Sequence, residues 1–259
     1  MNKPHIEITT RIGCRANCTF CPQSKLLESY KDDTKVLSFD SFKKYLHKIP
    51  KNIDIHFSGM AEPFLNPDAM RMIMHSVFEG YNVSIFTTLQ GLTLQQYEQL
   101  LVLDFDMFCV HIADDNEHTN IKVDEKYIEL LDYINKHKPK AKKFWHQCHG
   151  VPHKDIRHLI TMVDAYMIDR AGNVEHEMFT KTEIEGKFIC TAGDFNQNIL
   201  LPNGDVVLCC MDYGLEHFLG NLNDCSYFEL DKSKLYDAMN GKCKALCHKC
   251  NRAKGVDDE

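Results

Sequence analysis

The stretch RIGCRANCTFCPQ, residues 11–23, places three cysteines, Cys14, Cys18 and Cys21, within eight residues. It directly follows IEITT (6–10), whose alternation of apolar and polar residues is typical of a β-strand. Three thiols so close together in a loop after a strand indicate a metal centre rather than a disulfide. A structural zinc site takes four protein ligands, so a group of three either lacks one ligand or leaves a position open.

The composition limits the class of protein. The chain has 259 residues, 44% hydrophobic and 26% charged, which suits one large or two small globular domains. Its net charge of −7 offers no basic field to nucleic acid or to an acidic membrane surface. No apolar run approaches the ~20 residues of a membrane span, and the N-terminus does not resemble a signal peptide. We therefore expect a cytoplasmic protein without nucleic-acid or membrane partners.

The twelve cysteines are unevenly spread along the chain. In a reducing compartment such a number indicates metal or redox chemistry. Only Cys109 and Cys148 lie between the first group and residue 190. The remaining seven, all in the last seventy residues, are Cys190, Cys209, Cys210, Cys225, Cys243, Cys247 and Cys250. Two thiol-rich regions around a cysteine-poor middle predict two metal sites.

The first 172 residues alternate between strand-like and helix-like segments. The candidate strands are 6–10, 53–59, 82–88, 106–113, 142–148 and 163–170. The candidate helices include 38–49, with Asp40 as a plausible cap, 66–80 and 92–103. This alternation predicts an α/β fold with a parallel sheet. Six units fall short of a closed eight-unit barrel, so we expect an open partial (β/α)6 barrel over residues 1–172.

After residue 172 the pattern changes. Residues 173–188 are polar and predict a linker. The run NQNILLPNGDVVLCC (196–210) predicts a β-hairpin around Pro202-Asn203-Gly204. A helical stretch near 226–240 and the segment CKALCHKC follow, and the acidic end VDDE predicts a solvated tail. We therefore expect a second domain over 189–259, built of a hairpin and a helix around a metal cluster.

The spacing Cys-x3-Cys-x2-Cys, with Phe20 before the third cysteine, resembles the signature of radical S-adenosylmethionine (SAM) enzymes. The resemblance implies a [4Fe–4S] cluster bound by Cys14, Cys18 and Cys21, with SAM as the ligand of the open iron. It also implies a site at the carboxyl ends of the barrel strands. Zinc, or cysteines without a ligand, is the alternative interpretation.

Further segments resemble the SAM-binding parts of that family. FSGMAEPFLNPD (57–68) is similar to its Gly-Gly-Glu-Pro segment, although Met60-Ala61 departs from it, and TTLQGLT (87–93) stands where relatives contact the SAM ribose. IDRAGNV (168–174) supplies an arginine whose guanidinium fork suits the SAM carboxylate or a substrate oxygen. The likeness implies that Glu62 receives the SAM amino group. The implied SAM-binding residues are Phe20, Gly59, Ala61, Glu62, Pro63, Thr88 and Arg170. An ordinary loop carboxylate and a solvated arginine are the alternatives for Glu62 and Arg170.

The C-terminal region resembles the auxiliary-cluster domain called SPASM, or its shorter form, Twitch. Cys190 and Cys209 have the spacing Cys-x13-Gly-x4-Cys of that domain. The likeness implies a second [4Fe–4S] cluster held by Cys190, Cys209, Cys247 and Cys250. A zinc knuckle is the alternative, and Cys243 could replace one of these ligands.

The whole layout is similar to that of Twitch-type dehydrogenases that oxidise an amino-cyclitol alcohol. This resemblance implies a radical SAM oxidoreductase in which a 5′-deoxyadenosyl radical takes hydrogen from a substrate C–H bond and the second cluster accepts an electron. It favours a sugar, amino-sugar or cyclitol as the substrate, and an external electron donor such as flavodoxin or ferredoxin. Candidates for the base that removes the hydroxyl proton are Arg170, His149 and Asp114.

Three other functions stay open at this stage. A radical epimerase would return hydrogen to the substrate from a spare thiol: Cys109, Cys148, Cys210 or Cys225. A peptide-modifying enzyme would use the same cofactors on a larger substrate. A non-catalytic metal-binding module is the alternative outside enzymes, although a three-thiol site beside Glu62 speaks against it.

Overall fold

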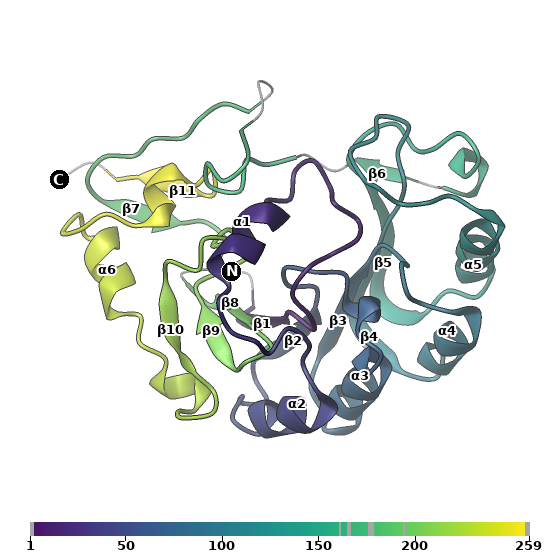
Figure 1. Ribbon diagram of the computed structural model, residues 1–259, viewed down its shortest axis with the longest axis horizontal. Coiled ribbons are helices and arrows are strands. Elements are labelled where there is room, and N and C mark those ends of the chain that lie inside the picture. Colours follow the sequence, from purple (N-terminus) through teal and green to yellow (C-terminus); the bar gives the residue numbers. More distant parts are fainter. Residues whose placement is uncertain (1–2, 161, 165–166, 176–178, 194, 257–259) are drawn as a thin grey trace.

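One twisted sheet organises the molecule (Figure 1). The computed structural model describes residues 3–160, 162–164, 167–175, 179–193 and 195–256. Within them the strand order is β10-β9-β8-β1-β2-β3-β4-β5-β6. The first six strands are β1 (His5–Ile8), β2 (Asp54–Phe57), β3 (Val83–Thr87), β4 (Asp104–His111), β5 (Lys140–Cys148) and β6 (Met162–Asp164). All neighbours from β1 to β6 pair in parallel, so the expected open partial barrel is confirmed.

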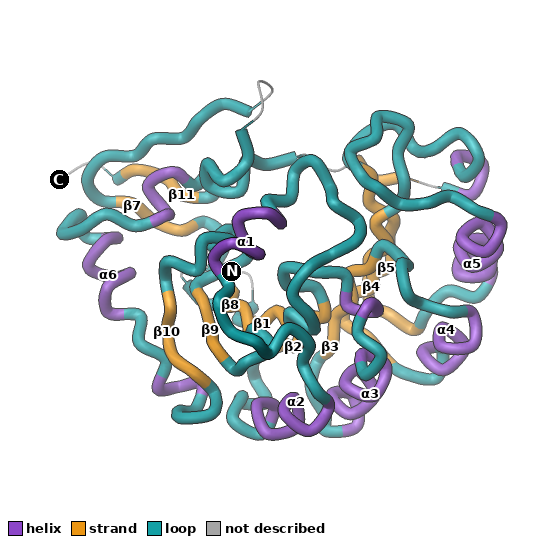
Figure 2. The backbone as a smooth tube through the Cα atoms, viewed as in Figure 1, coloured by secondary structure: helices purple, strands orange, loops and turns teal. Residues whose placement is uncertain are grey.

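Helices cover the outer face of this sheet, and loops gather at the end that carries the cysteine segment (Figure 2). They are α2 (Phe39–Leu46), α3 (Ala69–Phe78), α4 (Leu94–Leu100) and α5 (Glu125–Lys136). Helix α1 (Gln23–Ser29) follows the cysteine loop and packs instead with the C-terminal hairpin, where Leu26 shares a buried cluster with Ile199 and Val207. The cap of α2 is Ser38, whose side chain accepts from the Ser41 backbone N–H. Asp40, the expected cap, lies inside the first turn and pairs with Lys43 at 3.0 Å.

The two faces of the barrel strands differ in chemistry because side chains alternate along a strand. Ile6 and Ile8 of β1 are fully buried against the helix layer, in one core with Ile55 and Phe57 of β2. The alternate positions face inward and are polar: His5, Glu7, Asp54, His56 and Ser58. The inner face therefore lines a cavity instead of a packed core.

The C-terminal hairpin joins the barrel sheet directly. Strand β8 (Gln197–Leu200) pairs in parallel with β1, with His5 opposite Gln197. Strands β9 (Asp205–Val207) and β10 (Phe218–Asn221) continue the sheet in antiparallel pairing. The predicted hairpin is present, but its first strand extends the barrel sheet at β1, which the sequence did not indicate.

A separate two-stranded sheet gathers the end of the chain. Its strands are β7 (Phe188–Cys190) and β11 (Ala253–Gly255), which pair antiparallel with Cys190 opposite Ala253. The expected helical stretch near 226–240 is a 3₁₀ turn at Tyr227–Glu229 followed by α6 (Ser233–Met239). The proposed linker has no helix or strand in residues 173–175 and 179–187, and 176–178 lie outside the described residues.

Two predicted segments lie partly outside the described residues. Strand β6 ends at Asp164, so it covers only the start of the predicted strand 163–170. Residues 165–166 lie outside the described part, and 167–170 form no strand. Most of the expected acidic tail, residues 257–259, also lies outside it.

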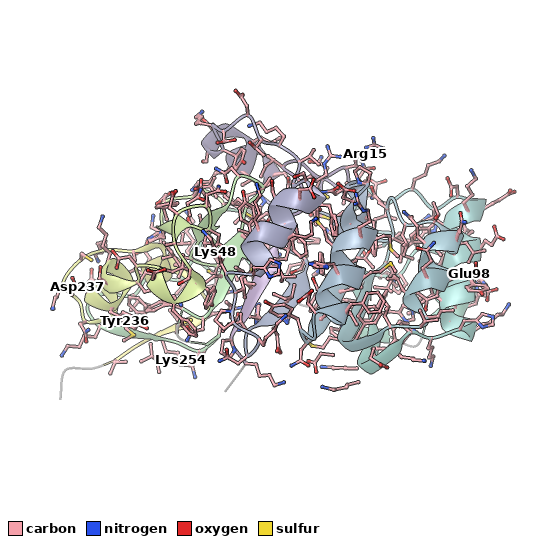
Figure 3. All side chains as sticks on the ribbon, turned by 90° about the horizontal axis from the view of Figure 1, so that it is seen from below. Arg15, Lys48, Glu98, Tyr236, Asp237 and Lys254 are labelled. Atoms are coloured by element: carbon pink, nitrogen blue, oxygen red, sulfur yellow. The ribbon has the colours of Figure 1, made fainter. Side chains whose placement is uncertain are left out.

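Charged side chains such as Arg15, Glu98 and Lys254 point outward from the surface (Figure 3). In the described residues, no helix combines the length and apolar character needed to cross a membrane.

The junction of the hairpin with the sheet gives a stability prediction. Asn198 on β8 is fully buried; its side chain donates to Phe195 O at 3.0 Å and Leu208 O at 2.8 Å, and accepts from Tyr227 Oη at 2.9 Å. Asn198→Ala leaves these groups without their partners and should lower the free energy of unfolding by about 1–3 kcal/mol. Denaturant unfolding under anaerobic conditions measures the change.

The matched control is Asn240→Ala, because Asn240 is exposed and its side chain donates to Tyr236 O, four residues earlier, at 2.8 Å. We expect a change within about 0.5 kcal/mol for this variant. Equal effects of the two substitutions would show that Asn198 does not secure the hairpin.

Candidate active site

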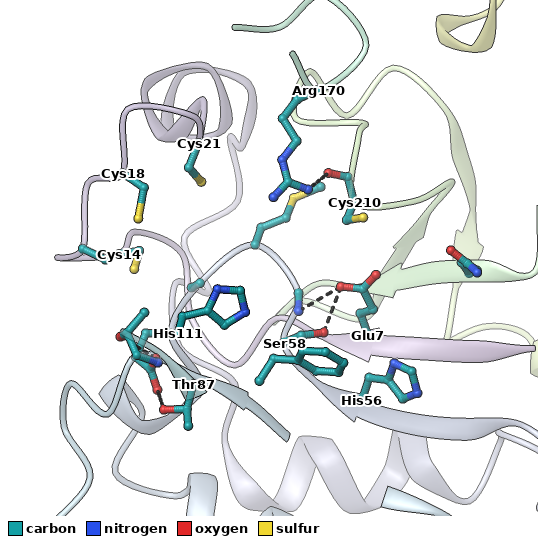
Figure 4. A pocket seen from close by; sticks show the side chains of 18 of the residues that line it. Glu7, Cys14, Cys18, Cys21, His56, Ser58, Thr87, His111, Arg170 and Cys210 are labelled. Atoms are coloured by element: carbon teal, nitrogen blue, oxygen red, sulfur yellow. Dashed lines mark hydrogen bonds between the residues drawn. The ribbon is translucent and has the colours of Figure 1, made fainter. Parts of the chain in front are cut away.

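The three N-terminal thiols face one cavity. Cys14, Cys18 and Cys21 lie on the loop after β1, at the carboxyl ends of the barrel strands, and Figure 4 shows their sulfurs directed toward a common space. The cavity has a volume of about 530 Å³. Burial raises the pKa of both Cys14 and Cys18. Three thiols with an open side fit a cluster that leaves one iron accessible.

The described side chains around the cavity do not form a binding site for a single metal ion. Among residues 3–256, apart from the undescribed gaps, no three His, Cys, Asp or Glu side chains are arranged to hold one ion. A [4Fe–4S] cluster makes another demand, because each thiolate binds a different iron atom.

The backbone of segment 59–63 passes very close to Thr9, just after β1, where the segment reaches the cavity. Gly59 has φ +60°, and a Cβ there would lie 2.5 Å from Thr9 Oγ1 and 2.8 Å from Thr9 N. Glycine is therefore required where this loop crosses the end of β1. Gly59 and Ala61 line the cavity. Pro63, also expected to bind SAM, is not among the lining residues; it starts a buried 3₁₀ turn, Pro63–Leu65.

Glu62 lines the cavity, but its carboxylate is already engaged by the chain. Oε1 accepts from Phe64 N and Thr87 Oγ1, at 3.1 and 2.8 Å, and Oε2 accepts from the backbone N and Oγ1 of Thr88. Four donors use the roughly four lone-pair sites of a carboxylate. The expected role of Glu62 as the acceptor for the SAM amino group is thus not supported. Its carboxylate instead joins segment 59–63 to the end of β3.

Thr88 and Phe20 both line the cavity. The hydroxyl of Thr88, expected at the SAM ribose, donates to Glu62 at 2.7 Å. The ring of Phe20 lies 4.0 Å from the ring of His149, centre to centre. His149 is therefore packed behind Phe20 and does not line the cavity, which argues against His149 as the base.

Asp114 is the second candidate base that the structure places elsewhere. Its carboxylate is buried and accepts from His118 N at 2.9 Å, Thr119 N at 3.0 Å and Thr119 Oγ1 at 2.8 Å. These bonds hold the loop after β4, in the manner of a local cap. Asp114 does not line the cavity.

Arg170 does reach the cavity. Arg170, Ala171 and Gly172 all have positive φ, +52°, +58° and +75°, so the chain turns sharply there. The guanidinium Nη1 donates to Cys210 O at 3.4 Å, and Nε is buried without a hydrogen-bond partner among the described residues. Asn173 ties this turn to the C-terminal region, because its Nδ2 donates to Arg170 O and Met211 O, both at 2.8 Å.

The sequence did not single out Glu7, which lines the cavity opposite the cysteine loop (Figure 4). Its Oε2 accepts from Ser58 Oγ at 2.9 Å and Gly59 N at 3.2 Å. Burial by itself raises the pKa of Glu7, but hydrogen bonding and charge from His5 outweigh it, and the net pKa lies below the ordinary value. Glu7 is therefore ionised at neutral pH.

Three histidines, His5, His56 and His111, also line the cavity, and the sequence did not single them out either. Burial lowers the pKa of His56 and of His111 to about 3, so both rings are neutral. The signal that could have found His5, Glu7 and His56 is the polar residue at every second position of HIEI and DIHF.

The C-terminal thiols gather at a second, smaller cavity of about 40 Å³. Its lining includes the four expected ligands: Cys190, Cys209, Cys247 and Cys250. Cys190 ends β7, Cys209 follows β9, and the 3₁₀ turn Leu246–Lys249 brings in the last two. Four thiols from three elements fit a fully ligated cluster. Cys243 is exposed and is not part of this lining.

The remaining thiols differ in access. Cys109 and Cys148 are buried in the barrel and line neither cavity, and Cys225 bonds to Asn221 O at 3.3 Å. Cys210 lines both cavities.

Comparisons with known proteins agree with this geometry. The family model of the radical SAM superfamily matches residues 8–165, and that of the SPASM iron–sulfur cluster-binding domain matches residues 190–251. No curated protein matches the chain.

Solved structures share the fold at low identity. BtrN in complex with AdoMet and 2-DOIA has a TM-score of 0.64 at 16% identity, over 93% of this chain and 88% of that chain. Streptococcus suis SuiB bound to precursor peptide SuiA has a TM-score of 0.63 at 13% identity, over 96% and 69%. Native anSMEcpe with AdoMet and the Cp18Cys peptide has a TM-score of 0.60 at 14% identity, over 96% and 86%.

The match of the family model to more than half of the chain agrees with the thiol geometry at both ends. The chain belongs to the radical SAM superfamily and carries a C-terminal SPASM iron–sulfur cluster-binding domain.

Proposed function

We propose that this protein is a radical SAM oxidoreductase that oxidises an alcohol of a sugar, amino-sugar or cyclitol. The observation that carries the proposal is the contact between the two cavities: Gln197, Cys210 and Arg252 line both of them. A cluster at the second thiol set would therefore lie beside the substrate. The likeness to BtrN, solved with AdoMet and 2-DOIA, is at 16% identity and carries the fold alone, so the small substrate is part of the proposal.

The donor sets fit two [4Fe–4S] clusters, one at Cys14, Cys18 and Cys21 and one at Cys190, Cys209, Cys247 and Cys250. When bound, the cofactors supply the hard chemistry: SAM and the first cluster give a hydrogen-abstracting radical, and the second cluster accepts an electron. An external donor such as flavodoxin or ferredoxin would supply the initial electron. The chain itself must hold the substrate, exclude water and remove a proton.

Arg170 and Glu7 are suited to these last tasks. A guanidinium remains protonated in proteins, so Arg170 donates hydrogen bonds to the SAM carboxylate or a substrate oxygen and is not the base. Glu7 is an ionised carboxylate on the cavity wall and has the correct form to accept the hydroxyl proton. We therefore assign the base to Glu7 rather than to His149 or Asp114.

The first test is SAM cleavage. With a strong reductant, the anaerobic protein should convert SAM to 5′-deoxyadenosine, and Cys14→Ala, Cys18→Ala or Cys21→Ala should abolish this reaction because the first cluster loses a ligand. Chromatography of the products measures it. Cleavage that persists in all three variants would refute the assignment of the first site.

The control for this test removes the other thiol set. Replacing Cys190, Cys209, Cys247 and Cys250 together with Ala should preserve cleavage and leave about half the iron, roughly four of eight atoms. Loss of a cluster on Cys243→Ala, but not on Cys247→Ala, would show that the second ligand set is different.

The second test concerns the base. Glu7→Gln should retain SAM cleavage but slow substrate oxidation by about 10²-fold or more, because the amide cannot accept the hydroxyl proton. The ratio of oxidised product to 5′-deoxyadenosine measures this uncoupling. Asp114→Asn is the matched control at a buried carboxylate outside the cavity and should leave the ratio unchanged. A normal ratio in the Glu7 variant would remove Glu7 from the reaction.

A radical epimerase is the second candidate, and the position of Cys210 favours it. Cys210 is the spare thiol that lines the main cavity, whereas Cys109, Cys148 and Cys225 do not line it. A thiol there could return hydrogen to the substrate radical. Peptide modification has the support of SuiB and anSMEcpe, but at 13–14% identity that likeness carries the fold alone.

The third test separates oxidation from epimerisation by the product formed in D₂O. Oxidation removes two hydrogens, so the product mass falls and no solvent deuterium is incorporated at carbon. Epimerisation with Cys210 as donor leaves the formula unchanged and adds one deuterium, since thiol hydrogen exchanges with solvent. Mass spectrometry decides. We expect oxidation; one deuterium in the wild-type product, lost in Cys210→Ser, would overturn it.

A further inference from the structure

A tyrosine of the C-terminal region contacts a thiol of the N-terminal triad. The Tyr213 hydroxyl oxygen lies 3.2 Å from Cys21 Sγ, although the two residues are 192 positions apart. Tyr213 follows β9, and its side chain is only 2% exposed. The contact therefore links the SPASM domain to the first thiol set.

Packing fixes the ring of Tyr213. A small apolar cluster, distinct from the main core, joins the cysteine loop and α1 to the hairpin. Its buried members are Ile12, Leu26, Tyr30, Met60, Ile199, Leu201, Val207 and Tyr213. Because both parts of the chain contribute to it, the position of the hydroxyl depends on how the hairpin seats against the cysteine loop.

A second donor meets the same sulfur. Gln23 Nε2 lies 3.3 Å from Cys21 Sγ and donates to Met60 O at 2.6 Å. Gln23 is therefore held locally by the loop, whereas Tyr213 comes from the other domain. Of Cys14, Cys18 and Cys21, it is Cys21 whose sulfur contacts a side chain of the SPASM domain.

The direction of the hydrogen bond follows from the chemistry of a ligating thiolate. A cysteine sulfur bound to iron carries no proton, so it can only accept, and Tyr213 must donate. One-electron reduction adds negative charge to a cluster and its sulfurs. A donor aimed at a ligand sulfur stabilises the reduced form more than the oxidised form, and hydrogen bonds to the sulfurs are among the factors that set cluster potentials.

We propose that Tyr213 tunes the first cluster: its hydroxyl donates to Cys21 Sγ and makes the cluster easier to reduce. This rests on the proposed cluster at Cys14, Cys18 and Cys21. Tyr213 also lines the main cavity, and the inference concerns only the hydrogen bond of its hydroxyl with Cys21, through which it acts as a positioning residue. It also couples the ease of reduction at the first site to the position of the hairpin, which leads directly to Cys209 of the second thiol set.

The test compares the wild-type protein with Tyr213→Phe, both loaded anaerobically with iron and sulfide. Phe keeps the ring in the apolar cluster and removes only the hydroxyl. The first cluster is identified as the one whose electron paramagnetic resonance (EPR) signal changes when SAM is added. Potentiometric titration of that signal should give a more negative midpoint in the variant. A tenfold change in the reduction equilibrium corresponds to about 59 mV for one electron.

The matched control is Tyr97→Phe. Tyr97 is also buried, but it lies on α4, away from the hairpin, and its hydroxyl donates to His137 O at 2.7 Å and not to a thiol. This variant should leave the midpoint of the SAM-responsive signal unchanged. An unchanged midpoint in Tyr213→Phe, or an equal shift in both variants, would overturn the role of Tyr213.

A second measurement covers the case in which Tyr213→Phe takes up no iron. The unmutated chain produced with 3-fluorotyrosine has more acidic hydroxyl donors, so its midpoint should become less negative; no shift would refute the proposal. A different result would refute the first cluster itself and not the role of Tyr213. In that case the wild-type protein would bind iron but show no EPR signal that responds to SAM.

Discussion

The backbone pairing of β1 with β8 is the constraint on which the arrangement of the sites depends. Strand β1 leads into the loop that carries Cys14, Cys18 and Cys21, while β8 begins the hairpin that leads to Cys209 and Cys210. Parallel pairing, extended by Thr9 N donating to Leu200 O at 2.9 Å, aligns the carboxyl ends of both strands. The two thiol sets, far apart in sequence, therefore border adjoining cavities.

The open barrel makes a cavity out of what would be a core in a closed barrel. A closed eight-strand barrel fills its interior with branched apolar side chains. Here the inward positions of β1 and β2 are His5, Glu7, Asp54 and His56, and burial of such groups costs free energy unless partners satisfy them. Ser58 and Gly59 satisfy Glu7, and the helix-facing positions supply the apolar core. The fold thus separates stability and chemistry onto opposite faces of the same strands.

Hydrogen bonds within the chain fix the rim of the cavity. Glu62 with its four donors, and Gly59 pressed against Thr9, hold segment 59–63 on the ends of β1 and β3. Such preorganisation means that the site does not have to reorganise when charge develops during a reaction. Asn173 does the same for Arg170 by joining its turn to Met211.

The sequence alone determined the parts that depend on local pattern. Alternating strands and helices indicated the partial barrel, and cysteine spacing indicated two thiol sets, because both signals lie within short stretches of chain. The tertiary structure decided what depends on contacts between distant segments. In the structure, the ring of His149 packs against Phe20, and the carboxylate of Asp114 accepts hydrogen bonds from its own loop. The carboxylate of Glu62 accepts hydrogen bonds from Thr88. Glu7 and Tyr213, which are far apart in sequence, both line the cavity. Periodicity gives the side of a strand on which a residue lies; strand order and loop packing determine what it meets there.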